Sequence, residues 1–432
     1  LDLAPDAKPK KLVIPIASDD KTNPEKPMTF TQGASDFAIS KDEQAIIYSV
    51  HGELFRMGNQ SAVKAARLTD HPADDFGAVW APDSSKAAFL SDRTGKIEIY
   101  LLESADTDHP KLMDAHQFKQ TRITKDDRPE SNLTFSPDGK KIYFVRSGIL
   151  ASINLDGSGE KPIVPDGGVG DYQWSPDGKW IVYSKRDAFF ASELFLVGSE
   201  GPTPENPARN ITRYATSNFS PSFSIDGKKL AFISERRSSP SVFVMDLYRP
   251  TAKPTPNQQV DFEEIHLRVN QVGTSNANEV AISPNGTRVA YRSGNDLWVA
   301  NVSGGQNTRL TTGNLNPTQI RWSRKMVANG IFNDIIYFKD GNGQLRSIRG
   351  SSTGTPSDLS SLSFKAKMLV RPEEENLEIF DQCWRLLADN FYDRKFHGSN
   401  WNQVRDKYRP MVKHSPMKED FQTLIFLMLG EL

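Results

Sequence analysis

Cysteine is nearly absent from this sequence of 432 residues, and so is any excess of charge of one sign. The one cysteine, Cys383, excludes an intramolecular disulfide and a cysteine-rich zinc site. We expect it to be a small core residue, because free cysteine is commonly buried. The 53 basic and 54 acidic residues give a formal net charge of −1, so nothing in the charge favours a nucleic acid partner. No apolar run reaches the roughly 20 residues that span a bilayer.

Motifs for metal binding and for nucleophilic catalysis are also missing. None of the seven histidines belongs to a tight metal-binding pattern, so we expect loop or surface histidines, no metal and no cofactor. The segment Gly350–Gly354 formally fits the nucleophile elbow, which needs a buried strand before it and an apolar helix after it. Pro356 and further serines follow instead. We therefore interpret the segment as a flexible loop and name no catalytic residue.

What the sequence does contain is one short turn pattern in seven copies. Its clearest forms are Ser136–Lys140, Ser175–Lys179 and Ser283–Thr287, which read Ser-Pro-Asp/Asn-Gly followed by Lys or Thr. Proline fixes φ near −65°, the Asp or Asn side chain caps the turn, and glycine supplies the position with φ above zero. The seven copies start at Ser40, Ala81, Ser136, Ser175, Ser224, Ser283 and a degenerate Ser323.

Strand patterns surround each copy. An alternating apolar run follows the turn, as in Lys141–Val145, and a third apolar run comes next, as in Glu193–Val197. A polar–aliphatic–Thr segment ends 12 residues before the next copy, at Thr69, Thr124, Thr212 and Thr311. Four strands in units of this length predict an all-β fold, a seven-bladed β-propeller over residues 30–370. Solenoid coils are shorter, and two sandwiches would not keep this spacing.

The strand that closes the propeller stays open between two candidates. Ser361–Met368 is placed to become the outer strand of the last blade, and Lys11–Ile16 competes with it. Residues 17–28 are polar and contain proline, so we interpret them as a linker. Residues 1–29 are thus predicted to be an N-terminal strand and linker. Because the chain starts at Leu1 rather than Met, we expect that a segment before it has been removed.

The pattern changes to helical spacing after residue 370. Proline and three acidic residues in Arg371–Glu375 favour a helix start. A second helix is predicted over Trp401–Tyr408, stopped by Pro410, and a third begins with Ser415 as its cap. Sixty residues of small helices make a thin core. We therefore predict that residues 371–432 are the truncated start of a helical subdomain whose remainder would cover its apolar face.

The helical segment carries a specific resemblance. Ile379–Asp393 resembles the first helix of the core domain of tricorn-type serine peptidases, and Phe396–Trp401 resembles the His-Gly-x-x-Trp segment that follows it. Lys407–Pro410 and Leu429–Leu432 also match that family. The match of His397 implies a structural turn. Together, the propeller and these helices resemble the N-terminal portion of tricorn protease homologues, which belong to the C-terminal-processing peptidase superfamily.

This resemblance implies a function for a larger parent protein. In the family, a Ser-His pair with the catalytic histidine follows the Gly-Glu-Leu stretch, and a PDZ-like domain and the nucleophilic serine come later. The chain ends at Leu432, before all of them, so alone it is expected to be inactive. The resemblance implies that the propeller gates or guides unfolded peptides to the catalytic core. The implied partners are peptide substrates, the PDZ and core domains, and further copies of the chain. Both cytoplasmic and periplasmic locations fit.

Other functions stay open beside this one. A non-catalytic propeller that binds a protein partner is the alternative. The architecture of prolyl oligopeptidases would place a strand-rich hydrolase domain after the propeller, and the helical tail argues against it. Four arginines at similar blade positions either ring one face and bind carboxylates or pair locally with acids such as Asp92; local pairing is the simpler interpretation. They are Arg93, Arg146, Arg186 and Arg236.

Overall fold

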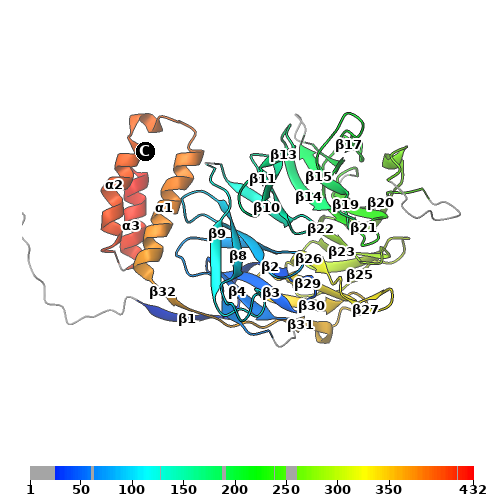
Figure 1. Ribbon diagram of the computed structural model, residues 1–432, viewed down its shortest axis with the longest axis horizontal. Coiled ribbons are helices and arrows are strands. Elements are labelled where there is room, and N and C mark those ends of the chain that lie inside the picture. The colour runs from blue at the N-terminus through cyan, green and yellow to red at the C-terminus, as the bar shows by residue number, and fades with distance from the viewer. Residues whose placement is uncertain are drawn as a thin grey trace, which may run out of the picture. The chain divides into compact units, whose positions relative to one another are not determined.

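The computed structural model describes residues 25–59, 63–126, 128–186, 191–237, 239–249, 260–415 and 417–432. The described residues divide into two compact units, one within residues 29–368 and one within residues 369–432 together with residues 25–28. The first unit contains seven antiparallel four-stranded sheets, which follow one another along the chain as the blades of a β-propeller (Figure 1). The predicted seven-bladed propeller is therefore confirmed.

Each blade runs from an inner strand to an outer strand without a crossover, apart from a short hairpin in the seventh. The inner strands are β2 (Ala34–Ile39), β6 (Asp75–Trp80), β10 (Glu130–Phe135), β14 (Val169–Trp174), β18 (Asn218–Phe223), β22 (Ala277–Ile282) and β26 (Thr318–Trp322). The second strands are β3 (Ala45–Val50), β7 (Ala87–Ser91), β11 (Lys141–Arg146), β15 (Trp180–Arg186), β19 (Lys229–Ser234), β23 (Arg288–Ser293) and β29 (Ile335–Lys339).

The two remaining strands of each blade complete it toward the outside. The third strands are β4 (Glu53–Gly58), β8 (Glu98–Ser104), β12 (Ile149–Asn154), β16 (Ser192–Gly198), β20 (Ser241–Asp246), β24 (Asp296–Asn301) and β30 (Leu345–Arg349). The outer strands are β5 (Ala66–Arg67), β9 (Phe118–Arg122), β13 (Lys161–Val164), β17 (Arg209–Asn210), β21 (Val269–Ser275), β25 (Thr308–Arg309) and β31 (Leu359–Ser361). Short elements between them are β27 (Met326–Ala328), β28 (Ile331–Phe332), η1 (Ile265–Leu267) and η2 (Pro356–Asp358).

The repeated turn joins the inner strand to the second strand and is held by its own side chains. In the third blade the Ser136 hydroxyl donates to Asp138 Oδ1 at 2.6 Å and accepts from the Lys141 amide at 3.0 Å. Gly139 has a φ of +72°, which glycine adopts without steric cost. Buried apolar side chains of neighbouring blades then pack face to face, as Leu101 of β8 and Phe144 of β11 do in one cluster.

The constant threonine explains the 12-residue spacing. In the sixth blade the Thr311 hydroxyl accepts from the Leu297 amide at 2.9 Å and donates to Asp296 Oδ1 at 3.1 Å. Thr69, Thr124 and Thr212 accept in the same way from the third strands of their own blades. The threonine therefore fixes the end of the outer strand against the start of the third strand before the chain returns to the channel.

We expect Thr311→Val to lower the free energy of unfolding of the propeller by about 2 kcal/mol. Valine has nearly the same shape but leaves the buried Leu297 amide without an acceptor, and such a loss costs about 1–3 kcal/mol. Chemical denaturation followed by tryptophan fluorescence measures the change. Thr308→Val is the matched control, because Thr308 is exposed on the same outer strand. Equal effects of the two substitutions would contradict a role of the hydroxyl.

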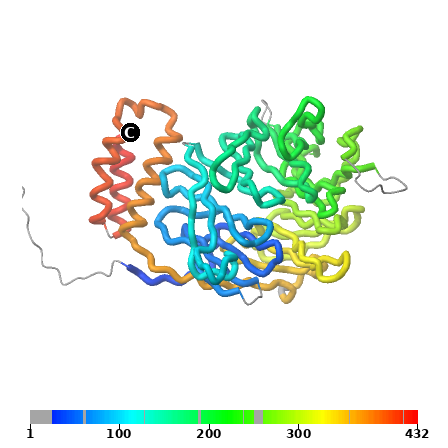
Figure 2. Tube along the Cα trace, viewed as in Figure 1, coloured from blue at the N-terminus to red at the C-terminus, as the bar shows by residue number. Residues whose placement is uncertain are grey.

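The first and last blades are each complete, so side chains and loop backbone join them instead of a shared strand. The Glu43 carboxylate is only 7% exposed and accepts from the Ser323 hydroxyl at 2.7 Å and the Arg324 amide at 2.7 Å. It also accepts from the Lys325 amide and the Tyr337 hydroxyl, each at 3.2 Å. We call Glu43 and these four partners the closing network. The blue first blade accordingly lies beside the yellow-to-orange last blade (Figure 2).

The structure corrects the first of the two sequence interpretations of closure. Ser361–Met368 does not form the outer strand of the last blade, because Leu359–Ser361 takes that position. The segment after it instead forms β32 (Ala366–Val370), which pairs with β1 (Lys26–Phe30) in a separate two-stranded sheet. Residues 26–28 are therefore strand and not linker. The competing candidate Lys11–Ile16 lies outside the described residues.

The second unit contains three helices, α1 (Pro372–Asn390), α2 (Trp401–Val412) and α3 (Lys418–Leu429), with the turn η3 (Phe396–Gly398) between the first two. The indole of Trp384 donates to the carbonyl of Trp401 at 2.9 Å, and the indole of Trp401 donates to the carbonyl of Trp384 at 3.1 Å. The partly buried Cys383 packs against the same cluster, as predicted. This exchange of bonds fixes α1 against the start of α2.

Two predicted helix boundaries are wrong. Helix α2 continues past Pro410 to Val412, because a proline in the last turn removes only one hydrogen bond before the helix ends. Ser415 does not cap α3, whose N-cap position is Met417. The Ser415 hydroxyl instead donates to the Met411 carbonyl at 3.1 Å and so completes the end of α2. Among the described residues, no helix combines the length and the hydropathy needed to cross a membrane.

Candidate functional site

The channel side of the propeller is shaped by an irregularity that every inner strand shares. All seven inner strands shift register against the second strand of their blade, each near the middle or start of the strand. A bulge of this kind bends the strand and turns a side chain in a new direction. Asn132, Ser220 and Gln319 adopt a positive φ at these positions. The sequence therefore presents polar groups to neighbouring blades at one level of the channel.

Most of these polar groups are already bound to the adjacent blade. The Asp36 carboxylate accepts from the Gly77 amide at 3.0 Å, and Asp171 accepts from the Ser220 amide at 3.2 Å. The Glu279 carboxylate accepts from the amides of Gln319 at 2.9 Å and Ile320 at 2.6 Å. Burial raises the pKa of Glu279, and these two hydrogen bonds oppose the shift. Such groups hold the blades together and are not available for a ligand.

Two cavities lie among the inner strands. The larger has a volume of about 700 Å³ and is lined from the first, second, third and seventh blades, including Asp36, Asp74 and Asn132. The smaller has a volume of about 330 Å³ and is lined from the first and the fourth to seventh blades. Arg321 of β26 lines both cavities. The side chain of this one residue therefore meets whatever occupies either cavity.

The guanidinium groups of Arg321 and its neighbour Arg324 are not engaged by other described groups of the protein. Across the described ranges, neither guanidinium makes a hydrogen bond or an ion pair. Desolvation lowers the pKa of Arg321, while the charges of Glu279 and Asp36 oppose that shift. Desolvation also lowers the pKa of Arg324, and the charge of Arg321 adds to the effect. A free, partly desolvated guanidinium is a strong site for a carboxylate, which it can bind through two parallel hydrogen bonds.

The four arginines singled out from the sequence make different contacts. Arg93 binds the buried Asp75 at 2.9 Å and lies over the Tyr100 ring at 4.5 Å, so its local acid is Asp75 and not the expected Asp92. Arg146 binds Glu130 at 2.7 Å and Glu160 at 2.6 Å. These two pairs match the local-pairing interpretation.

The other two members of that set lie elsewhere. The Arg236 guanidinium lies over the rings of Tyr214 at 4.8 Å and Phe243 at 4.9 Å, and desolvation lowers its pKa. Arg186 contributes to the wall of a cavity of about 480 Å³ at the fourth and fifth blades. The structure therefore does not bring the four arginines together as one carboxylate-binding ring.

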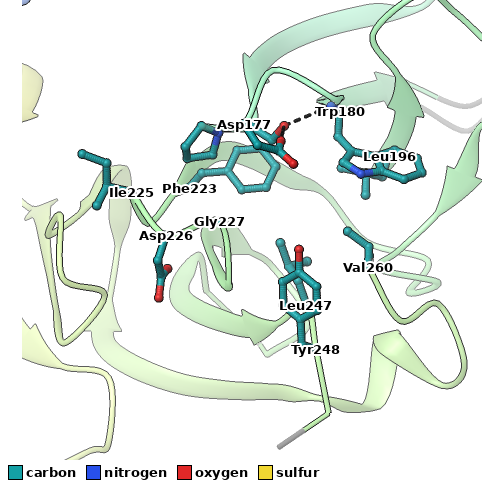
Figure 3. A pocket seen from close by; sticks show the side chains of 12 residues that line it. Asp177, Trp180, Leu196, Phe223, Ile225, Asp226, Gly227, Leu247, Tyr248 and Val260 are labelled. Atoms are coloured by element: carbon teal, nitrogen blue, oxygen red, sulfur yellow. Dashed lines mark hydrogen bonds between the residues drawn. The ribbon is translucent and has the colours of Figure 1, made fainter. Parts of the chain in front are cut away.

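A further pocket of about 230 Å³ lies between the fourth and fifth blades (Figure 3). Phe223, Leu247 and Val260 form apolar walls, and Asp177 and Asp226 of two repeated turns lie at its edge. Asp177 accepts from the Ser175 hydroxyl at 2.6 Å as part of its turn. The apolar residues of this pocket therefore pack two blades together, and its aspartates stabilise the repeated turns. Neither set offers a free catalytic group.

The remaining sequence candidates have structural roles. Asp358 binds the Ser352 hydroxyl at 2.6 Å, and η2 follows Gly350–Gly354 in place of the long helix that an elbow requires. The loop is thus held by hydrogen bonds, which the interpretation as a flexible loop did not foresee. His397 lies in the turn η3 with a φ of +52° and contacts the Leu432 carbonyl at 3.0 Å. Its predicted role in a turn is confirmed.

The comparisons with known proteins agree with this architecture. Residues 372–430 match the family model described as the tricorn protease C1 domain. The chain is 23% identical to a putative tricorn-like protease C-terminal subunit of Sulfurisphaera tokodaii, over 77% of this chain and 43% of the relative. It is 22% identical to a tricorn protease homolog of Saccharolobus solfataricus, over 72% of this chain and 32% of the relative.

A solved structure shows the same fold. The crystal structure of the tricorn protease superimposes with a TM-score of 0.71 at 15% identity, covering 95% of this chain and 42% of that chain. The propeller and the three helices therefore define the class, a seven-bladed β-propeller followed by a helical unit that matches the tricorn C1 domain model. The chain is similar to tricorn proteases and corresponds to less than half the length of these relatives.

Proposed function

We propose that the propeller binds unfolded peptides in its channel and guides them to the catalytic part of a tricorn-type serine peptidase. The observation that carries this proposal is the unpaired guanidinium of Arg321, which lines both channel cavities. Every peptide with a free C-terminus brings a carboxylate, so this contact recognises peptides without reading their sequence. The similarity to tricorn proteases supports peptides as the class of ligand.

The electrostatics of the channel favour such a ligand. Glu279 and Asp36 attract the Arg321 guanidinium, yet both carboxylates are occupied by backbone amides of neighbouring blades. Arg321 therefore keeps its hydrogen-bond donors for an incoming anion. Arg324 adds a second positive charge at the smaller cavity. The two positive charges thus attract the terminal carboxylate of a peptide.

We expect Arg321→Ala to weaken binding of an unstructured peptide with a free C-terminus by about 10- to 100-fold, because hydrogen bonds to charged groups contribute about 1.5–3 kcal/mol. Fluorescence anisotropy with a labelled peptide measures the affinity, and the same peptide with an amidated C-terminus should bind the wild-type chain as weakly. Arg128→Ala is the matched control, because Arg128 is an exposed arginine that pairs only locally with Asp126. Equal affinities for the free and amidated peptides would overturn the proposal.

The helical unit supplies the second half of the proposal. Leu386 is 64% exposed and Phe426 is 70% exposed, and they are two of several large apolar side chains that this small unit exposes. We propose that the PDZ and catalytic core domains of a tricorn-type peptidase cover these residues. Without those domains the chain should not react with an active-site serine probe. The alternative is a non-catalytic binding module that uses the same channel. It predicts that a longer form of the protein, with further domains, does not cleave peptides either.

A further inference from the structure

A loop of the second blade gathers two histidines and an aspartate at the surface. The loop spans residues 105–117 and connects β8 to β9. The potential ligand atoms of Asp106, His109 and His116 all lie within 4.8 Å of one another. The sequence predicts surface histidines without a metal, because none of the seven histidines belongs to a tight metal-binding pattern.

The geometry of the three side chains is close to that of a zinc site. His109 Nδ1 lies 3.0 Å from Asp106 Oδ2, and the imidazole rings of His109 and His116 lie 5.0 Å apart between centroids. Zinc–nitrogen and zinc–oxygen bonds of about 2.0–2.1 Å in a tetrahedron place ligand atoms about 3.3 Å apart. Side-chain movements of about 1.5 Å at most would therefore bring the three ligands to one ion.

The backbone of the loop is fixed independently of any ion. The buried Arg56 side chain reaches from β4 to the loop, where Nη1 donates to the carbonyls of Leu112 and, at 3.2 Å, Ala115. The Leu112 amide donates to the Ser85 carbonyl at 2.8 Å. The Ala105 amide donates to the Gln117 carbonyl at 2.9 Å and so joins the two ends of the loop. An ion would therefore meet ligands whose positions are already set, which is what a specific site needs.

The aspartate is held in place by the backbone of the loop. Asp106 Oδ1 accepts from the Asp108 amide at 3.1 Å, and Oδ2 accepts from the His116 amide at 3.3 Å. Both carboxylate oxygens are therefore fixed near the two imidazole rings, and a carboxylate with imidazole nitrogens is a common ligand set of zinc.

An Asp–His ion pair alone explains only part of this arrangement. It accounts for His109, whereas the His116 imidazole makes no hydrogen bond in the part of the chain that the structure describes and lies edge-on to the His109 ring. We propose that Asp106, His109 and His116 bind one zinc-class divalent ion, with water at the fourth position. The ion joins the two ends of the loop and stabilises the outer part of the second blade.

Titration calorimetry of the whole chain with zinc chloride at pH 7.5 tests this proposal. We expect one ion per chain, a binding constant at least tenfold weaker in His116→Ala, and an unfolding temperature that rises with zinc in the wild type and in the control variant but not in His116→Ala. His414→Ala is the matched control, because it removes an exposed histidine from the helical unit. Both variants are checked by circular dichroism, and since His116 is exposed we expect both to fold.

Cobalt(II) gives an independent readout. The wild-type chain should show the intense visible absorption of tetrahedral cobalt, and the absorption should disappear in His116→Ala. No zinc binding, one zinc per two chains, or equal binding by His116→Ala and His414→Ala would each overturn the proposal. These outcomes do not depend on whether the channel binds peptides.

Discussion

Replacing Glu43 by glycine should lower the free energy of unfolding of the propeller by about 3 kcal/mol. The substitution removes the acceptor of the Ser323 hydroxyl and of the Arg324 amide, and hydrogen bonds to a charged group contribute about 1.5–3 kcal/mol each. Glycine offsets part of this lost stability, up to about 1 kcal/mol, because Glu43 has a φ of +57° that glycine adopts more easily. The net loss follows from the closing network, which joins the first blade to the last.

The matched control for this experiment is Ser84→Gly. Ser84 occupies the same position of the repeated turn in the second blade and has a φ of +59°. It has no partner in the last blade, so glycine there should leave stability unchanged or raise it by up to about 1 kcal/mol. Urea denaturation followed by tryptophan fluorescence measures both variants. If both substitutions stabilise the propeller, the closing network contributes nothing and the account of closure is wrong.

Replacing Asp381 by alanine should destabilise the helical unit by about 3 kcal/mol. Asp381 of α1 is buried and accepts from Arg405 Nε at 2.8 Å and Arg409 Nε at 2.9 Å. Alanine leaves these two guanidinium groups of α2 without their shared acceptor, and the breakage of buried charged pairs is costly. Hydrogen exchange of amides in α1 and α2 measures the effect on this unit separately from the propeller. Asp406→Ala, an exposed change on α2, is the control.

The same interaction has a defined pH dependence. Burial raises the pKa of Asp381, but hydrogen bonds and charges from Arg405 and Arg409 outweigh it, so the pKa in the folded state lies below the usual value. The stabilisation is therefore complete above the unfolded pKa of about 4 and is lost as the pH falls through the folded pKa. The difference between wild type and Asp381→Ala should shrink below about pH 4. A difference that stays constant to pH 2 would show that packing, and not charge, accounts for it.

Much of the fold could be predicted from local patterns because each blade repeats the same local chemistry. The turn residues hydrogen-bond to one another, as Ser136 and Asp138 do. The repeated threonine, such as Thr311, hydrogen-bonds to the backbone of its own blade. Closure could not be predicted in this way, since Glu43 and Ser323 are separated by nearly the whole propeller. The end of α2 was missed because Pro410 lies where its lost hydrogen bond matters little.

The two residues that matter most for closure and binding break the repeat. Six of the seven turns have no charge at the position of Glu43, and four of them have glycine there: Gly139, Gly178, Gly227 and Gly286. Arg321 stands two residues before its repeat start, where the other six copies have Ala, Val, Thr, Gln, Ser and Ala. A comparison of the copies column by column would have singled out both. It would not have shown that Arg321 lacks a partner, which depends on where the bulges place the neighbouring carboxylates.

The most direct test of the central claim is photo-crosslinking of a peptide whose C-terminal residue carries a photoreactive group beside a free carboxylate. Mass spectrometry of the products locates the bound terminus along the chain. We expect crosslinks on the inner strands around Arg321, on β2, β6 and β26, and their loss with an amidated peptide or in Arg321→Ala. Crosslinks on the outer strands or on the helical unit, unchanged by amidation, would contradict binding of peptides in the channel.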